Sequence, residues 1–305
     1  MFVSTLHMQR AVFVAAPLFL ASLSACQASP PPRAGSQAPA DGATDGTVDI
    51  GDGLRLHVHC AGRGEPSVVM EAGFGSEGTA WQAVEPDIAA FTRVCVYDRA
   101  GTGYSSLPPR PHRFPQIARE LHTLLERLRI GTPFVLVAHS IGALYARFYA
   151  AEHPAGIAGM VLVDPTPDAA QFWSLLPPEA TREFDDPRNR EAVTFAALQE
   201  GLELVRHGSL SLGTRPFVLL TAGEEDSSPD IPPERAAQIA EVLRTSQREL
   251  TKLSSNSVHV VATKSHHFIQ LEAPALVLTA VREVVQSVRS KGRLDEAAIR
   301  AHAND

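Results

Sequence analysis

A serine stands where a strand pattern changes into a helix pattern, and its surroundings suit a nucleophile. Residues 134–138 form an apolar run typical of a buried strand, and residues 141–152 have a helical composition. Ser140 lies between them, on a sharp turn that would expose its hydroxyl above the edge of a sheet. The small residues Ala138 and Gly142 flank the turn, where strand and helix cross too closely for larger side chains. This stretch predicts a serine placed for nucleophilic attack.

Such a serine needs partners, because a hydroxyl is a weak nucleophile at neutral pH. It requires a base within hydrogen-bond reach, and the base requires an orienting acid. Two adjacent histidines, His266 and His267, follow the last predicted strand. Asp164 ends one predicted parallel strand and Asp226 follows the next, so either carboxylate could reach the edge of the sheet where Ser140 lies. The residues alone leave both choices open.

The elements that must position these side chains alternate along the chain. After a predicted hairpin at 47–60, continuous apolar runs alternate with helical spacing, which favours an α/β fold. We expect a mostly parallel central sheet with helices on both faces. The alternation stops at 165–212, a stretch rich in proline and aromatic residues, and resumes at 216–221. We interpret 165–212 as a cap inserted after the sixth strand, with Phe172 and Trp173 as candidate pocket walls or as packing within the cap.

The motifs together resemble the α/β-hydrolase family, over about residues 47–290. The stretch 138–142 resembles the family's G-x-S-x-G, with alanine for the first glycine, and 265–274 resembles G-H-x-x-x-x-E-x-P. The resemblance implies Ser140 as nucleophile and His267 as base, with His266 the alternative at the glycine position. Gly223 to Asp226 matches the family's G-x-x-D, which implies Asp226 as the acid and leaves Asp164 as its rival. A serine nucleophile argues against the haloalkane dehalogenases and epoxide hydrolases, which use aspartate.

Two backbone donors for an oxyanion are also implied by the resemblance. One is the amide of Ile141, the residue after the nucleophile. The other is the amide of Phe74, since residues 72–75 resemble the family's H-G-F-G with Ala72 in place of histidine. A further family landmark, D-R-x-G-x-G-x-S, matches residues 98–105, and we expect it to shape the loop without taking part in the chemistry.

The expected activity is hydrolysis of a carboxylic ester through an acyl-enzyme, acting on a small-molecule acyl substrate without a cofactor or metal. A proline-type aminopeptidase, or another amide hydrolase of the same fold, is the first alternative. The second is of another class: a non-catalytic, lipid-anchored binding protein built on a hydrolase fold. Net charge is −7 and no basic stripe is present, so nucleic acid is not an expected partner.

The N-terminus has the pattern of an export signal. Residues 1–25 combine Arg10 with a short apolar core, and Leu23 to Cys26 resembles a bacterial lipobox. We expect cleavage before Cys26 and lipidation of its thiol, with an ordinary secretory signal as the alternative. Residues 26–46 would form the lipidated cysteine and a flexible tether. The protein would then be exported to the cell envelope, at the outer membrane in a Gram-negative host, and otherwise periplasmic or secreted.

Two further cysteines, Cys60 and Cys95, lie at or near the ends of predicted strands. A disulfide between them is chemically allowed in an exported chain, and two buried free thiols are the alternative. The last residues, 291–305, are expected to form a polar tail.

Overall fold

The computed structural model describes residues 44–224 and 231–304 of the 305-residue chain. The predicted signal peptide, Cys26, nearly all of the tether and Asp226 lie outside the described residues. Within the described ranges, no helix is long and apolar enough to cross a membrane. The first strand already begins at Thr44, three residues before the expected start of the domain.

An eight-stranded sheet forms the centre of the molecule, in the order β1-β2-β4-β3-β5-β6-β7-β8. β1 and β2 form the predicted hairpin, and β2 pairs with β4 antiparallel, whereas all pairs from β4 through β8 are parallel. The predicted mostly parallel α/β sheet is therefore confirmed. The strands are β1 Thr44–Gly51, β2 Leu54–Ala61, β3 Val68–Glu71, β4 Val94–Tyr97, β5 Phe134–His139, β6 Ile157–Val163, β7 Phe217–Ala222 and β8 Ser257–Ala262.

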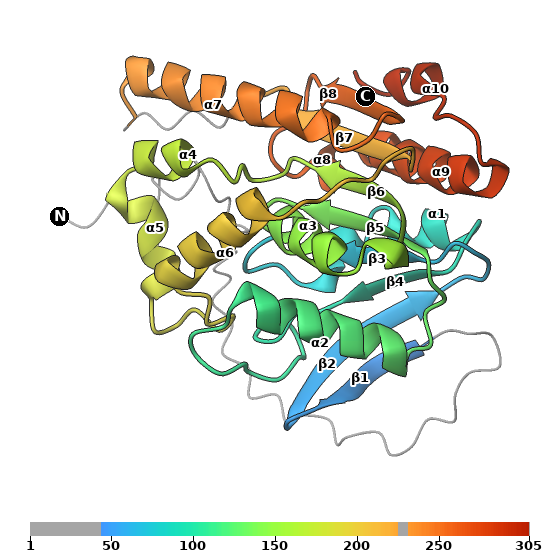
Figure 1. The fold of residues 1–305 in the computed structure, drawn as a ribbon, viewed down its shortest axis with the longest axis horizontal. Helices are drawn as coiled ribbons and strands as arrows, with labels where there is room; N and C mark the ends of the chain where they lie inside the picture. The colour runs from blue at the N-terminus through green and yellow to red at the C-terminus, as the bar shows by residue number, and fades with distance from the viewer. Residues whose placement is uncertain (1–43, 225–230, 305) are drawn as a thin grey trace, which may run out of the picture.

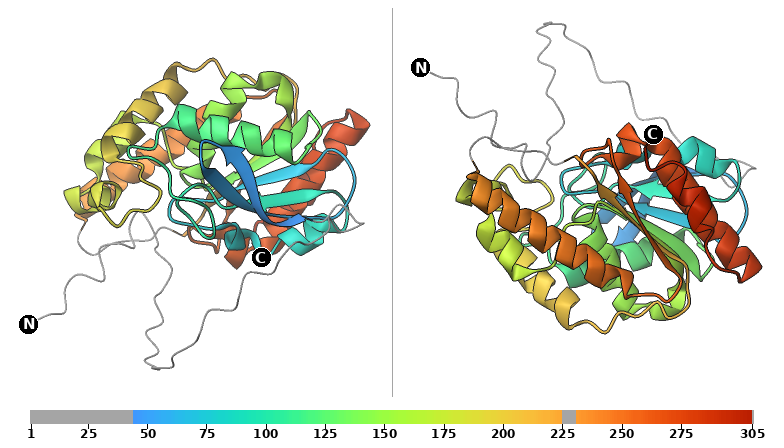
Figure 2. Two further views of the ribbon diagram at one scale, coloured as in Figure 1. Left: turned by 90° about the horizontal axis from the view of Figure 1, so that it is seen from below. Right: turned by 90° about the horizontal axis from the view of Figure 1, so that it is seen from above.

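Helices cover both faces of this sheet (Figures 1 and 2). Alternate residues of a strand point to opposite faces of the sheet. Because both faces are covered here, the central strands are apolar throughout. Leu136 of β5 lies in the core with α2 and α3, whereas Val135 and Val137 lie in the core with α1 and α9. The helices outside the insertion are α1 Glu85–Ala89, α2 Phe114–Arg127, α3 Gly142–Glu152, α7 Pro233–Thr251, α8 Ile269–Glu272, α9 Pro274–Ser290 and α10 Glu296–Arg300, with 3-10 turns η2 Gly78–Trp81 and η3 Pro154–Gly156.

The segment between β6 and β7 contains three helices: α4 Ala170–Leu175, α5 Pro178–Asp185 and α6 Phe195–His207. α4 lies beside α7, and α6 lies beside α3 (Figure 1). Phe172 and Trp173 are buried, and the Trp173 ring contacts Phe184 and Phe195 within the same segment. This packing favours the interpretation that the two aromatics hold the cap together.

Two further features are a disulfide within the sheet and the packing of the C-terminal segment. Cys60 of β2 and Cys95 of β4 are direct cross-strand partners and are joined by a disulfide. The C-terminal segment, expected to be a polar tail, includes α10, whose Ile299 is buried against the core around α9. The backbone amide of Thr263 also donates to the carbonyl of Ala303 at 2.9 Å, so this segment is part of the packed domain.

Candidate active site

Ser140 occupies the turn between β5 and α3, as the motif predicts. Its φ of 56° lies in the left-handed region, which costs free energy for a residue with a side chain and is often found at functional sites. Its amide donates to the carbonyl of Val163 at 3.1 Å, which ties the turn to the neighbouring strand. A Cβ at Gly142 would lie 2.3 Å from the Ala72 carbonyl oxygen, so the close crossing requires glycine there.

The imidazole of His267 reaches this serine from the loop between β8 and α8. His267 Nε2 lies 2.9 Å from Ser140 Oγ, within hydrogen-bond reach for a base. His266 is engaged elsewhere: its backbone amide donates to the Glu272 carboxylate at 2.8 Å, and its ring Nδ1 lies 3.1 Å from the same oxygen. Of the two adjacent histidines, the geometry therefore selects His267 as the partner of Ser140.

The acid that contacts His267 is Asp164, which follows the end of β6. Asp164 Oδ2 accepts a hydrogen bond from His267 Nδ1 at 2.6 Å, and its Oδ1 accepts one from the Ala222 amide at 2.9 Å. The expected assignment had Asp226 as the acid and Asp164 as its rival, and among the described residues the contact with His267 Nδ1 belongs to Asp164. Nδ1 carries one hydrogen, and Asp164 already accepts it, whereas Asp226 lies outside the described residues. The order along the hydrogen bonds is Ser140, His267, Asp164.

His139, directly before the serine, is a further member of the site that the motif did not single out. Its ring is buried, and Nε2 donates to the main-chain carbonyl of His267 at 2.9 Å. Burial, followed by the nearby His267 ring, holds the pKa of His139 well below its usual value. A neutral imidazole with hydrogen on Nε2 fits this contact, and it fixes the backbone that carries the base.

The loop after β3 lies against the nucleophile. A Cβ added at Gly73 would approach Ser140 Cβ to 3.2 Å and His139 Nδ1 to 3.0 Å, so Gly73 permits this close packing. Phe74 is the next residue of the loop. Ile141 directly precedes α3, so its amide belongs to the amino-terminal end of that helix. Of the two predicted donor residues, Ile141 directly follows Ser140 in the chain, and Phe74 directly follows Gly73, which lies close to Ser140.

Comparisons with known proteins agree with this architecture. A family model described as the alpha/beta hydrolase fold matches residues 66–212. The uncharacterized protein YqjL of Bacillus subtilis (strain 168) is 28% identical over 234 residues, which cover 76% of this chain and 89% of that protein. A thermophilic esterase structure from Thermogutta terrifontis has a TM-score of 0.56 at 21% identity, covering 81% of this chain and 98% of that one.

The haloalkane dehalogenase DatA of Agrobacterium tumefaciens C58 is also similar, with a TM-score of 0.59 at 18% identity over 81% of this chain and 98% of that one. At such identities a structural likeness establishes the fold. This protein has the α/β-hydrolase fold. The family model agrees with this fold, and neighbours with different chemistries do not select a reaction.

Behind the glycine-rich loop lies a buried ionic cluster of Arg99, Glu71 and Glu191. The Arg99 guanidinium contacts the Glu71 carboxylate, and its Nη2 lies 3.0 Å from both carboxylate oxygens of Glu191. Burial opposes the charge on Arg99, but Glu191 and Glu71 raise its pKa well above the usual value. Burial raises the pKa of Glu71, against the lowering influence of Arg99. The motif 98–105 pointed to Arg99, but its partner Glu191 carried no sequence signal.

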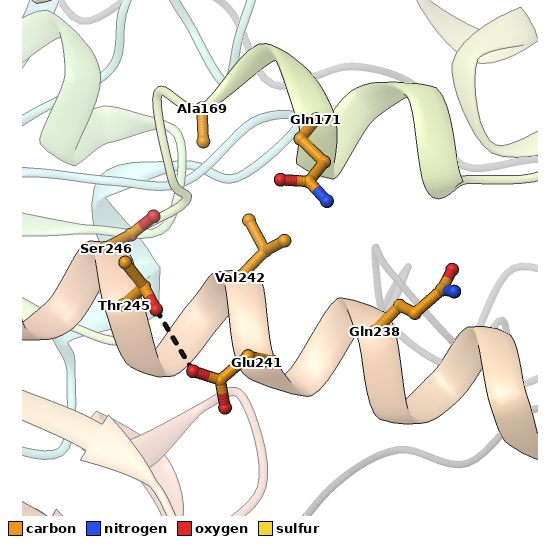
Figure 3. A pocket seen from close by; sticks show the side chains of 7 residues that line it. All are labelled: Ala169, Gln171, Gln238, Glu241, Val242, Thr245 and Ser246. Atoms are coloured by element: carbon orange, nitrogen blue, oxygen red, sulfur yellow. Dashed lines mark hydrogen bonds between the residues drawn. The ribbon is translucent and has the colours of Figure 1, made fainter.

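A pocket of about 260 Å³ opens elsewhere, along the seam between α4 and α7 (Figure 3). Five of its seven lining residues have polar side chains, and Thr245 donates to Glu241 at 3.3 Å within it. Glu241 also accepts hydrogen bonds from Arg244 and Arg248, so its carboxylate is already engaged. The pocket is lined by Ala169, Gln171, Gln238, Glu241, Val242, Thr245 and Ser246, none of which belongs to the catalytic array. Across residues 44–224 and 231–304, no cluster of three or more potential metal ligands occurs.

Proposed function

We propose that this protein is a serine hydrolase that cleaves carboxylic esters through an acyl-enzyme intermediate. The observation that carries the proposal is the continuous path of hydrogen bonds from Ser140 through His267 to Asp164. Nucleophile and base are 2.9 Å apart, and base and acid are 2.6 Å apart, the geometry in which a histidine can activate a hydroxyl. The left-handed turn at Ser140 adds support, because such strain is typical of a nucleophile presented on a tight turn.

In the proposed reaction, His267 Nε2 takes the proton of Ser140 as Oγ attacks the ester carbonyl carbon. The carbonyl oxygen becomes an oxyanion, which the amides of Phe74 and Ile141 would stabilise. Asp164 holds the His267 ring in the correct tautomer and stabilises the imidazolium that forms. His267 then gives its proton to the leaving alcohol. A water molecule, deprotonated by the same base, attacks the acyl-enzyme and releases the carboxylic acid product and free Ser140.

An esterase is among the similar solved structures, which is consistent with an ester substrate. Serine at the nucleophile position weighs against the chemistry of the similar dehalogenase, for which the family resemblance implies aspartate. An amide or aminoacyl substrate remains the first alternative. A non-catalytic binding protein is the second, but an intact hydrogen-bonded array would then have no use.

Covalent labelling tests the proposal directly. Wild type should react with a fluorophosphonate probe, and Ser140→Ala should not, while the nearby surface variant Ser174→Ala should label like wild type. Turnover of p-nitrophenyl esters of increasing acyl length, beside matched anilides and aminoacyl anilides, would rank the substrates. Faster hydrolysis of aminoacyl anilides than of every ester would move the assignment to an amide hydrolase. No labelling of folded wild type, with no turnover, would favour the binding protein.

We also propose export and lipid attachment through Cys26. The Cys60–Cys95 disulfide supports this proposal, because such bonds persist in oxidising compartments. Several buried acyl chains at about 0.8 kcal/mol per CH₂ would hold the protein firmly on a membrane. Wild type expressed in a Gram-negative host should fractionate with the outer membrane, and Cys26→Ser should be released. Recovery of wild type in the soluble periplasmic fraction would contradict the anchor.

A further inference from the structure

The buried cation Arg99 makes more contacts with the glycine-rich loop than an ion pair alone requires. Its Nη1 donates to the Ala72 carbonyl at 2.5 Å, and its Nη2 donates to the Gly73 carbonyl at 2.6 Å. The guanidinium therefore binds two consecutive main-chain carbonyls as well as the carboxylates of Glu71 and Glu191. A buried ionic cluster is weak evidence for stability, because apolar residues of similar volume often serve as well. The backbone contacts point to a different purpose.

The carbonyl of Gly73 and the amide of Phe74 belong to one peptide group. That group is planar and trans, so its C=O and N–H point in opposite directions. The Gly73 oxygen accepts from Arg99 at 2.6 Å and from the Ser76 amide at 3.2 Å, so Arg99 helps to set the plane of this peptide and directs the Phe74 N–H away from itself. A Cβ added at the adjacent Gly73 would lie 3.2 Å from Ser140 Cβ, so this peptide lies close to the serine. A hydrogen bond from a cation to the carbonyl also polarises the peptide, which strengthens its N–H as a donor.

The cap contributes to the same arrangement through Glu191, which lies between α5 and α6. The Glu191 carboxylate accepts a hydrogen bond from the Gly75 amide and binds Arg99, so one side chain joins both. The Phe184 ring of α5 lies 4.6 Å from the Phe74 ring. Residues on both sides of the predicted donor are thus tied to the cap. Gly101 of the same motif as Arg99 permits this approach, because a Cβ there would lie 2.2 Å from the Arg190 carbonyl oxygen.

We propose that Arg99 is a positioning residue of the oxyanion hole and that Glu191 couples the cap to it, an inference that rests on the proposed hydrolase function. Neither side chain touches the reacting atoms. Arg99 acts through the peptide group of Gly73 and Phe74, and Glu191 acts through Arg99 and Gly75. The motif that seemed only to shape a loop thereby contributes to the electrostatics of the reaction.

The matched control is another partly buried ion pair between core and cap. Arg147 of α3 donates to Asp168 at 3.0 Å, without contact to the glycine-rich loop among the described hydrogen bonds. Arg99→Met and Arg147→Met each remove one such cation. For all proteins, kcat and KM for p-nitrophenyl acetate, the inhibition constant of an alkyl trifluoromethyl ketone and the melting temperature would be measured. The ketone's adduct with a serine carries an oxyanion, so its affinity reports on the donors.

For Arg99→Met we expect kcat to fall about 10- to 100-fold with KM changed less than about threefold, somewhat below the loss for deleting a donor outright. The inhibition constant should rise by the same factor as kcat/KM falls. Glu191→Gln, which keeps the shape of the side chain, should show the same pattern with a loss of about 3- to 10-fold. Arg147→Met should lower the melting temperature while its kcat and inhibition constant stay within about twofold of wild type.

If Arg99→Met does not fold, Arg99→Lys and Glu191→Gln carry the same test. Folded Arg99 and Glu191 variants with wild-type kcat and inhibition constants would overturn the positioning role and leave the hydrolase standing. A loss in Arg147→Met that equals theirs would also overturn it, since the effect would then follow stability alone. Wild type without Ser140-dependent turnover would instead overturn the proposed function.

Discussion

The two sides of Ser140 are held by different kinds of interaction. On the side of the base, Asp164 accepts a hydrogen bond from the Ala222 amide, and the neutral ring of His139 donates one to the His267 carbonyl. These are hydrogen bonds to main chain at the ends of packed strands. On the side of the glycine-rich loop, the fixing group is the buried cation Arg99, whose partner Glu191 comes from the cap. The first side is held mainly by the core, although Thr166 at the start of the cap donates its amide to the Ser140 carbonyl at 3.2 Å. The second side is shared between core and cap through Glu191.

This difference separates two properties that a hydrolase must combine. In the proposed mechanism, proton transfer between Ser140 and His267 depends on hydrogen bonds that lie mainly in the core. In the same proposal, stabilisation of the oxyanion depends on a loop that the cap helps to fix. Variation in the cap could therefore adjust the rate with one substrate or another without altering the nucleophile and base.

The largest effect is expected when the proposed nucleophile or base is replaced. Ser140→Ala and His267→Ala should each lower kcat by about 10⁶, with the double variant little worse than either, because residues that act as a unit are not additive. The Arg99 cluster is untouched, so binding of a substrate analogue should be retained. Steady-state kinetics and calorimetric titration would measure both. Additive losses in the double variant would contradict a shared mechanism.

The second prediction concerns the acid. Asp164→Asn should lower kcat by about 10³ to 10⁴ with folding intact, because the asparagine amide would favour the wrong tautomer of His267. Asp226→Asn is the matched control and should cost far less. Kinetic assays at pH 7.5, with circular dichroism to check folding, would rank the two. The reverse ranking would restore Asp226 as the acid and leave the rest of the mechanism unchanged.

The choice between Asp164 and Asp226 as the acid could not be made from the sequence. The nucleophile and base could be predicted, because each is set by a local pattern: a strand followed by a small-residue turn, and a histidine before the last helix. The sheet could also be predicted from its apolar runs. The acid requires a choice between the ends of β6 and β7, which are neighbours in the sheet. Parallel strands separated by under about 5 Å deliver their ends to the same edge, so spacing cannot decide between them.

The partners of Arg99 could not be predicted for a related reason. Glu191 is 92 residues away in the sequence and lies in a segment without regular structure. Nothing local distinguishes it from the other charged residues of the cap, such as Glu179 or Glu183. His139 was similarly hidden, since it occupies the variable position of the nucleophile motif. Contacts made across the fold by single side chains are fixed by tertiary packing, which a pattern of residue types does not contain.

The third prediction tests whether the disulfide between β2 and β4 influences the glycine-rich loop. Replacing both Cys60 and Cys95 with alanine should lower the free energy of unfolding by about 3 to 4 kcal/mol, from the loop-closure entropy of a bond that spans 35 residues. Cys95 lies four residues before Arg99, on the strand that leads to it. Denaturant unfolding and kcat would be measured together. We expect kcat within about twofold of wild type, and a larger loss would mean that the disulfide helps to place Arg99.

The smallest effect concerns pH and the base side. The pKa of His139 lies well below its usual value in the folded protein, because of burial and the neighbouring His267, whereas in the unfolded chain it is about 6.5. As pH falls below about 6.5, His139 therefore binds a proton in the unfolded chain but stays neutral in the folded protein. Stability associated with a neutral His139 is fully present above this pH and is lost as pH falls toward the lower folded pKa, at up to about 1.4 kcal/mol per pH unit.

The variant His139→Gln isolates this contribution, since glutamine can still donate to the His267 carbonyl but does not titrate. Urea unfolding at pH 7.5, 6.5 and 5.5 should show a steeper loss of stability for wild type than for the variant. His57, whose pKa is raised chiefly by its hydrogen bond to Asp98, changes the stability with pH in the opposite direction. His57 is present in both proteins, so its contribution cancels in the difference between their slopes of unfolding free energy against pH. Equal slopes would mean that His139 takes up a proton in the folded state, and that a neutral ring does not hold the backbone of the base.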